Sequence, residues 1–306
     1  FSSCVLIESG DSLDSINATA TSIVKYISKK AGIGIGTGSV RAAGARVGDG
    51  SIVHTGLVPF LKYFQAAVKS CSQGGVRGGA ATVYLPIWHY EYEDLIVLKN
   101  NKGTEENRVR HMDYSFQLNK LMYERLISGG NITLFDPKDV PGLYDAFYAD
   151  QVKFKELYEK YEKVRSIRKK VLPALEVFQS LLQERKDTGR IYIMNVDHAN
   201  EHGSFDPKVA PIRMSNLCCE IDLPTKPLES YDDPNGEISL CTLSAINWGL
   251  INHPHEFKKY CNLAVRGLDE LLDYQDYPIL AAELSTMARR PLGIGIINLA
   301  YFLAKR

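Results

Sequence analysis

Residues 216–221 hold the side chains of this sequence that are best suited to chemistry. They read Asn-Leu-Cys-Cys-Glu-Ile, and the pattern predicts an extended strand over residues 215–221. Alternate side chains of a strand share a face, so Asn216, Cys218 and Glu220 should point the same way. That face would carry a thiol that can lose an electron and a proton, a carboxyl roughly 6 to 7 Å along as a base, and an amide to hold a polar substrate. The alternative is a polar strand end beside a loop, with Cys218 as a buried filler.

Two further cysteines, Cys4 and Cys241, lie in strand-like segments. If a sheet brings their Cα atoms within about 4.4 to 6.8 Å, the two thiols can form a reversible disulfide. Beside a third thiol, such a pair would store two electrons next to a one-electron agent. The alternative is a pair of unrelated core cysteines, because cysteine is often buried. Cys219 is another possible partner, although neighbouring residues on opposite strand faces make a strained pair.

We expect no metal site. His198 and His202 are metal-ligand residue types, but Gly203 follows at once and the segment leaves a predicted strand. Without a helix, the two histidines would not share a face.

The elements that must position these residues alternate between strands and helices. The pattern predicts helices over residues 13–31, 57–68, 255–272 and 279–287, and strands over residues 1–7, 81–87, 131–135, 191–196 and 239–247. Residues 91–128 and 144–185 read as mostly helical, with a break at Pro173, and the glycine-rich stretches 32–50 and 70–80 read as loops. This alternation favours a mostly parallel sheet wrapped by helices.

Composition narrows the classes of protein that fit. The 306 residues are 45% hydrophobic and 24% charged, which indicates a globular fold. The 36 basic and 36 acidic side chains balance, which argues against a general nucleic-acid or anionic-membrane binder. The longest apolar stretch, residues 291–304, is interrupted by Asn298 and is shorter than the roughly 20 residues of a membrane-spanning helix. Six cysteines with no secretory leader pattern favour a reducing compartment, the cytoplasm.

Seven segments of the chain resemble one known family. They are residues 1–5 (FSSCV), 11–16 (DSLDSI), 69–82 (KSCSQGGVRGGAAT), 107–114 (NRVRHMDY), 139–147 (DVPGLYDAF), 215–218 (SNLC) and 223–227 (LPTKP). The chain resembles the large, catalytic (alpha) subunit of class I ribonucleoside-diphosphate reductase, of the aerobic class Ia type, and most closely its enterobacterial and T-even-phage forms. The resemblance runs through nearly all positions, and segments this long do not recur by chance.

The resemblance implies an oxidoreductase that reduces ribonucleoside diphosphates to deoxyribonucleoside diphosphates, the precursors of DNA. It implies that Cys218 becomes the thiyl radical that takes the substrate's 3′-hydrogen, that Glu220 is the base on the 3′-hydroxyl, and that Asn216 hydrogen-bonds the substrate. Cys4 and Cys241 would supply two reducing equivalents as the 2′-hydroxyl leaves as water, and would end as a disulfide. The implied substrate-binding positions are Ser3, Cys4, Gly32, Arg77, Asn216, Leu217, Cys218, Cys219 and Glu220.

The resemblance also implies allosteric control. Asp11, Ser12, Leu13 and Arg41 match a site for a deoxynucleoside triphosphate or ATP effector at the interface of a large-subunit homodimer, whose helices would lie at about residues 11–71. Residues 73–80, with Arg77, match the loop that reports the effector's identity to the substrate base. A glycine-rich loop suits that task because it takes several backbone conformations at small cost.

No cofactor or metal is implied within this chain. The resemblance implies a small (beta) subunit of the di-iron tyrosyl type as the radical source, and thioredoxin or glutaredoxin as the source of reducing equivalents. The alternative function is a nucleotide-binding, dimer-forming fragment that is inactive alone and complements another large-subunit fragment. The set Cys4, Asn216, Cys218, Glu220 and Cys241 favours the enzyme, because a sensor has no use for it.

The implied fold is α/β: about the first half of a ten-stranded α/β barrel with a finger-like strand that carries the radical cysteine. Residues 1–306 would be the catalytic barrel portion, without the amino-terminal regulatory region and the second half of the barrel. The chain starts at Phe1 in a strand-like segment and ends within an apolar helical pattern at residues 295–306, as a piece of a longer protein would. We therefore expect the isolated chain to be inactive.

Overall fold

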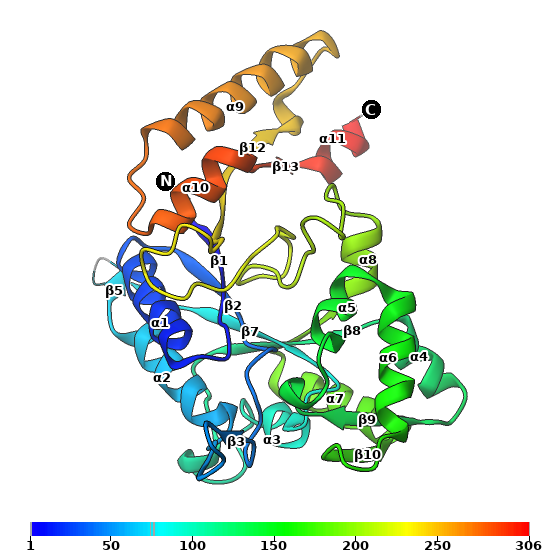
Figure 1. Ribbon diagram of the computed structural model, residues 1–306. Helices are drawn as coiled ribbons and strands as arrows, with labels where there is room; N and C mark the ends of the chain where they lie inside the picture. The colour runs from blue at the N-terminus through cyan, green and yellow to red at the C-terminus, as the bar shows by residue number, and fades with distance from the viewer. Residues whose placement is uncertain (1, 74, 76, 306) are drawn as a thin grey trace.

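A seven-stranded sheet forms the centre of the computed structural model, which describes residues 2–73, 75 and 77–305 (Figure 1). The strand order is β11-β8-β7-β2-β1-β12-β13. The first five are parallel to one another: β1 (Cys4–Glu8), β2 (Gly32–Gly36), β7 (Ala81–Pro86), β8 (Asp113–Leu118) and β11 (Ile191–Asn195). β12 (Ser239–Asn247) runs antiparallel to β1 and parallel to β13 (Leu292–Ile297). The predicted α/β class is confirmed, as a seven-strand half-barrel.

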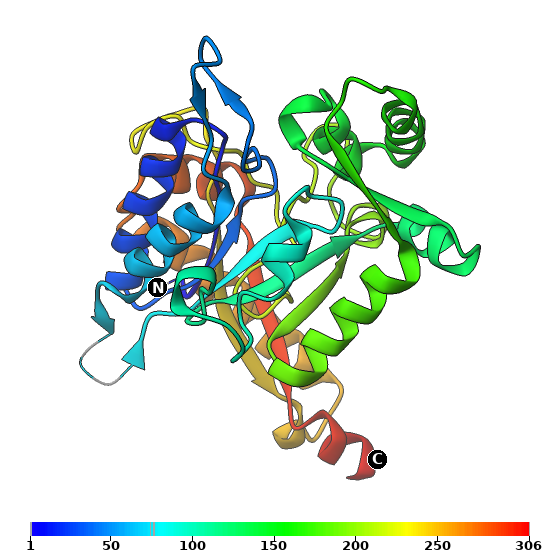
Figure 2. The same cartoon turned by 90° about the horizontal axis from the view of Figure 1, so that it is seen from below.

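Helices flank the sheet (Figures 1 and 2). α1 (Leu13–Ser28) packs on β1, β2 and α2 (Leu57–Lys69), while α7 (Ala174–Thr188) packs on β11, and α9 (His255–Tyr274) and α10 (Leu280–Arg289) pack on β12. The remaining helices are α3 (Tyr92–Ile96), α4 (Lys120–Ile127), α5 (Leu143–Ala149), α6 (Gln151–Lys163), α8 (Val196–Glu201) and α11 (Leu299–Lys305). Three two-stranded pairs complete the described fold: β3 (Arg46–Val47) with β4 (Ile52–Val53), β5 (Ser72–Gln73) with β6 (Arg77–Gly78), and β9 (Asn131–Phe135) with β10 (Lys169–Pro173).

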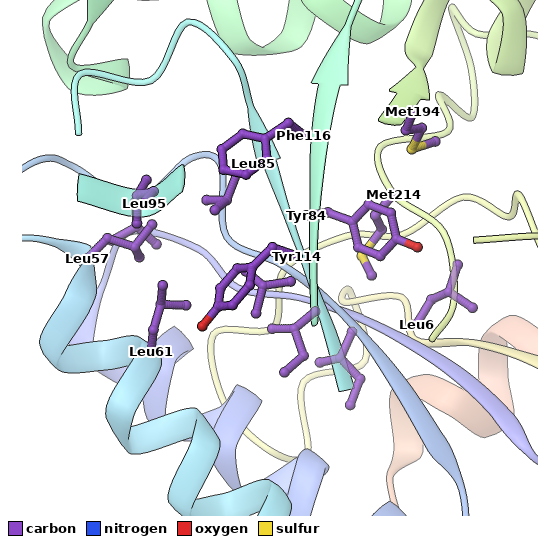
Figure 3. Packing of buried hydrophobic residues seen from close by; sticks show 14 of the residues in the cluster. Leu6, Leu57, Leu61, Tyr84, Leu85, Leu95, Tyr114, Phe116, Met194 and Met214 are labelled. Atoms are coloured by element: carbon purple, nitrogen blue, oxygen red, sulfur yellow. The ribbon is translucent and has the colours of Figure 1, made fainter. Parts of the chain in front are cut away.

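The central strands are buried on both faces. Every residue of β7 is buried, as are four of the five residues of β1. In Figure 3, Leu57 and Leu61 of α2 lie on one side of the sheet, while Tyr84 lies beside Met214 on the other side. Parallel sheets covered on both faces lose the alternation of apolar and polar residues, because both sets of side chains enter a core.

Burial on both faces explains why sequence patterns missed β8, and two strands that are more exposed were missed as well. Residues 113–118 were expected within a helical stretch, but they form β8 between β7 and β11, where five of the six residues are buried. β10, within the predicted helical stretch 144–185, is a half-exposed strand that pairs with β9, and the helical pattern resumes after Pro173 as α7. Residues 292–297 form β13, not the helix expected from residue 295, and only α11 is helical.

The glycine-rich stretch 32–50 does not begin as the loop expected there. Residues 32–36 (Gly-Ile-Gly-Ile-Gly) form β2, in the middle of the sheet. Ile33 and Ile35 are fully buried in the core, and the glycines alternate with them on the opposite face. The reason for glycine on that face is the chain segment that lies against it.

Candidate active site

Residues 213–225, called the finger loop below, join the strands of the half-barrel between α8 and β12 and cross the middle of the molecule (Figure 1). The strand predicted over residues 215–221 is wrong: these residues form a tight turn, closed by a bridge between Ser215 and Asp222. The Oδ1 atom of Asn216 accepts the backbone N–H groups of Glu220 (3.0 Å) and Ile221 (3.1 Å). Cys219 sits at φ +64°, in the left-handed region that a strand cannot use. A local side-chain acceptor has therefore replaced strand pairing.

The turn changes which side chains are presented. Asn216 is fully buried, whereas Cys218 and Glu220 are exposed at the tip of the loop. The prediction of one shared strand face is therefore wrong, although Cys218 and Glu220 both remain exposed on the same turn. The Nδ2 atom of Asn216 donates to the Cys4 sulfur at 3.4 Å, which brings the loop against β1.

Cys4 and Cys241 lie directly opposite each other on the antiparallel strands β1 and β12, and both are unbridged thiols. Opposed residues of such a pair have Cα atoms about 4.5 to 5.5 Å apart, within reach of a disulfide. Burial, and to a smaller extent the neighbouring Cys4 and Glu220, raise the pKa of Cys241 to about 12. Cys241 is therefore a protonated thiol at neutral pH, and the Glu220 carboxylate is close enough to influence it.

The finger loop lies on β2 and β7. A Cβ at Gly34 would overlap the carbonyl oxygen of Ser215, and a Cβ at Gly32 would lie 2.6 Å from Cδ2 of Leu217. On the adjacent strand, the Thr82 hydroxyl donates to the Leu217 carbonyl (2.6 Å) and the Tyr84 hydroxyl to the Asn216 carbonyl (2.5 Å). Gly32 and Leu217, which are both expected to bind substrate, thus lie against each other.

Thr82 and Tyr84 were missed from the sequence. The one available signal was the alternation of glycine with isoleucine in residues 32–36, which is typical of a strand that another backbone approaches closely.

Other side chains surround the thiols. Tyr192 on β11 was not expected at the site; burial raises its pKa, and the charge of Cys218 contributes to the rise. Burial also raises the pKa of the half-buried Cys219, while a hydrogen bond with Tyr84 lowers it. Ser3 is exposed, with its hydroxyl 4.0 Å from the Cys4 sulfur.

The residues expected at an effector site also come together, at the other end of β1. The Asp11 carboxylate accepts hydrogen bonds from the backbone N–H (2.7 Å) and the Nε atom (2.7 Å) of Arg41. The Nη2 atom of Arg41 lies 2.6 Å from the same carboxylate. Ser12 caps α1 by accepting the N–H of Ser15, and its hydroxyl donates to Glu229 (3.2 Å). Leu13 is 68% exposed at the start of α1, as an interface residue would be.

The loop expected to read the effector is described only in part. β5 and β6 form a short hairpin that pairs Gln73 with Arg77. Gly74 and Val76 lie outside the described residues, as do the side chains of Gln73 and Arg77. The role of Arg77 in substrate binding stays a prediction.

The histidine pair is on a helical turn after all. α8 includes His198 and ends next to His202, and the two ring centroids are 5.8 Å apart. The expectation that no helix forms there is wrong, because Val196–Glu201 begins a helix directly after β11. Within residues 2–73, 75 and 77–305, no three His, Cys, Asp or Glu side chains form a group suited to a metal ion. Over the same residues, every helix is too short or too polar to cross a membrane.

The structure is thus an α/β half-barrel with a cysteine-bearing turn beside a cross-strand pair of thiols. Comparison with known proteins specifies the class: residues 2–306 match the family model "Ribonucleotide reductase, barrel domain". The whole chain is 67% identical to the ribonucleoside-diphosphate reductase subunit alpha of Haemophilus influenzae and 65% identical to the ribonucleoside-diphosphate reductase 1 subunit alpha of Escherichia coli, covering 40% of each. It is 54% identical to the subunit alpha of Enterobacteria phage T4, over 99% of the chain and 40% of that relative.

The chain belongs to the ribonucleotide reductase family, as the barrel-domain portion of a class I large (alpha) subunit. It spans about 40% of the length of these relatives.

Proposed function

We propose that this chain forms the catalytic part of a reductase that converts ribonucleoside diphosphates to deoxyribonucleoside diphosphates. The observation that carries the proposal is the convergence of Cys4, Cys241 and the Cys218 turn at one place in the half-barrel. Residues 1–306 would serve as the barrel portion, and the helices at about residues 11–71 would carry the effector site and the dimer contact.

The chemistry that the family resemblance implies assigns one role to each of these residues. Cys218, exposed at the turn, takes the 3′-hydrogen of the ribose as a thiyl radical, and the exposed Glu220 accepts the proton of the 3′-hydroxyl. The 2′-hydroxyl leaves as water. Cys4 and Cys241 together give two electrons and two protons and become a disulfide, and Cys218 returns its hydrogen to C3′. Because Cys241 is protonated at neutral pH, it can supply a hydrogen as well as an electron.

Asn216 contributes through the turn. Its oxygen holds the N–H groups of Glu220 and Ile221, and its nitrogen reaches the Cys4 sulfur. A hydrogen bond from this side chain to the substrate would use the second N–H group of the amide.

Partners would complete the cycle. A small beta subunit of the di-iron tyrosyl type would generate the radical, and thioredoxin or glutaredoxin would reduce the Cys4–Cys241 disulfide after each turnover, in the cytoplasm. A deoxynucleoside triphosphate or ATP would bind near Asp11, Ser12, Leu13 and Arg41, where a charged pair already stands at the start of α1.

Replacement of the radical thiol tests the proposal. In a complete large subunit that contains this chain, Cys218→Ser should abolish reduction of cytidine diphosphate and leave the thermal unfolding temperature and effector binding unchanged. Cys261→Ser, at an exposed cysteine on α9, is the matched control and should turn over normally. Turnover retained by Cys218→Ser would refute the assignment. Effector binding without turnover in the unsubstituted protein would favour the nucleotide-binding alternative.

A further inference from the structure

Glu8, the last residue of β1, is a fully buried carboxylate that the chemistry above does not use. Burial raises its pKa above the ordinary value of a glutamate, and the guanidinium of Arg213 offsets only part of that rise. A buried carboxylate costs free energy unless charged and hydrogen-bonding partners offset that cost. The identity of those partners therefore indicates what Glu8 does.

The partners of Glu8 come from both ends of the finger loop. At the start of the loop, Nη1 of Arg213 lies 3.5 Å from Oε1 of Glu8. At its end, the Thr225 hydroxyl donates to Oε2 at 2.8 Å. One carboxylate thus joins residues 213 and 225, and the turn with Cys218 lies between them. The Tyr144 hydroxyl on α5 donates to Oε1 at 3.3 Å.

Neighbouring bonds hold the same two points. The Nε2 atom of Gln117, at the end of β8, donates to the Arg213 carbonyl at 2.7 Å. The Ser239 hydroxyl, at the start of β12, donates to the Pro224 carbonyl at 2.5 Å. Glu8 is the one residue among these that contacts both ends of the loop through its side chain.

β1 connects the two ends of the finger loop, which meet at Glu8, to the turn in the middle of the loop. Positions 4 and 8 of a strand share a face, so Cys4 and Glu8 point to the same side of the sheet. The Cys4 sulfur accepts a hydrogen bond from the Asn216 amide in the turn, and Glu8 binds the two ends of the loop. A single rigid strand therefore sets both the position of the reducing thiol and the position of the loop that carries Cys218.

We propose that Glu8 is a positioning residue for ribonucleotide reduction, whose carboxylate joins the two ends of the finger loop and thereby fixes the distance between Cys218 and the thiol pair. The inference rests on the proposed function. Gln117 and Ser239 each bind one end of the loop, but Glu8 joins the two ends to each other. When either of its bonds is removed, the two ends can shift relative to each other, and the reacting thiols then spend less time in a productive arrangement.

The test uses a complete large subunit containing this chain, with its small subunit, and the substitutions Glu8→Gln and Thr225→Val. We expect kcat for cytidine diphosphate to fall by roughly tenfold to a hundredfold, since a misplacement of about 1 Å can cost about a hundredfold. KM and effector affinity should stay the same. Thr225→Ser keeps the hydroxyl and should keep the kcat of the unsubstituted protein. The double variant with Glu8→Gln and Thr225→Val should lose no more kcat than the more impaired of the two single variants. Asp145→Asn is the control, because Asp145 also pairs with Arg213 (2.8 Å) but its side chain is 67% exposed and does not touch the end of the loop.

A second measurement does not depend on turnover. In Glu8→Gln and in Thr225→Val, the backbone N–H groups of Glu220 and Ile221 should exchange with deuterium faster, while the amides of β2 and β7 should be unaffected. Unchanged exchange in a folded Thr225→Val protein, or unchanged kcat, overturns the role of Glu8. If unsubstituted protein and Asp145→Asn both fail to reduce ribonucleotides, the proposed function fails, and the exchange data alone then decide on the positioning role.

Discussion

Cys241 shows how one side chain's surroundings set its chemistry. It is buried on β12 opposite Cys4, and its pKa of about 12 is set first by burial and then by the Cys4 thiol and the Glu220 carboxylate. A raised pKa keeps the thiol protonated, and the buried neutral thiol is favoured until pH rises toward that value. The same carboxylate that would act as a base on the substrate therefore also suppresses thiolate formation at the reductant.

This coupling predicts a change in thiol reactivity. Glu220→Gln removes a negative charge near Cys241, so the pKa of Cys241 should fall and more thiolate should be present at pH 8. Alkylation of Cys241 by iodoacetamide, followed by mass spectrometry, should speed up by roughly threefold, which corresponds to about half a pKa unit. Glu229→Gln, at an exposed carboxylate hydrogen-bonded to Ser12, should leave the rate unchanged. An equal or slower rate in Glu220→Gln would contradict the electrostatic coupling.

β2 is the element that gives the finger loop its place. Its buried isoleucines join the core, while its glycines leave space on the opposite face for residues 215–217. β7, its neighbour, adds the hydroxyls of Thr82 and Tyr84, which bind two carbonyls of the loop. Together, the glycines of β2 leave room for the backbone of the finger loop, and the hydroxyls of β7 donate hydrogen bonds to its carbonyls.

Filling that space should displace the loop. Gly34→Ala would put a methyl group against the Ser215 carbonyl, and we expect turnover to be lost and the protein to be destabilised by about 1 to 3 kcal/mol, the usual cost of overpacking. Gly267→Ala on α9 is the matched control, since a Cβ there meets nothing and should stabilise the helix by about 0.5 to 1 kcal/mol. Both effects can be measured by thermal unfolding and ribonucleotide reduction in a complete large subunit. Normal turnover by Gly34→Ala would show that the loop does not need this contact.

Sequence patterns located most elements, including the fully buried strand β7, but missed several strands, among them β8 and β2. The amphipathic helices α1, α2 and α9 and the strands β1, β7, β11 and β12 were predicted close to their observed bounds. β8 was missed because burial on both faces removes its alternation, and β2 because glycine reads as loop unless the approaching backbone is known.

The sequence indicated which residue types would meet at the candidate site, but it did not indicate their geometry. Cys4 and Cys241 lie on two strands that the sequence predicted, but the sequence left open whether these strands pair and bring the two cysteines face to face. The turn at Cys218 depends on the amide of Asn216, which accepts two backbone N–H groups instead of facing a substrate from a strand. Nothing in the spacing of these residues distinguishes the two arrangements, since both are compatible with the same six residues.

At the scale of the whole molecule, the sheet has one apolar end. β13 pairs with β12 on one side, and among the described residues no strand pairs with its other edge. The side chains of β13 and α11 are partly exposed although apolar: Ile296 (46%), Ile297 (50%), Leu299 (41%), Tyr301 (57%) and Leu303 (64%). An apolar strand edge of this kind favours pairing with another strand.

The final prediction concerns complementation. Because the chain spans about 40% of its relatives and carries an open apolar edge, we expect the isolated 306-residue chain to reduce no ribonucleotide, even with a small subunit and thioredoxin. Addition of a polypeptide that supplies the part of the Escherichia coli alpha subunit following the matched region should produce a complex, slow deuterium exchange in residues 292–297 and restore turnover. A lysine at Ile296, Ile296→Lys, should weaken that complex, whereas Val152→Lys, at a 71% exposed residue on α6, should not. Turnover by the isolated chain would show that the thiols, the finger loop and the effector residues suffice without the rest of the barrel.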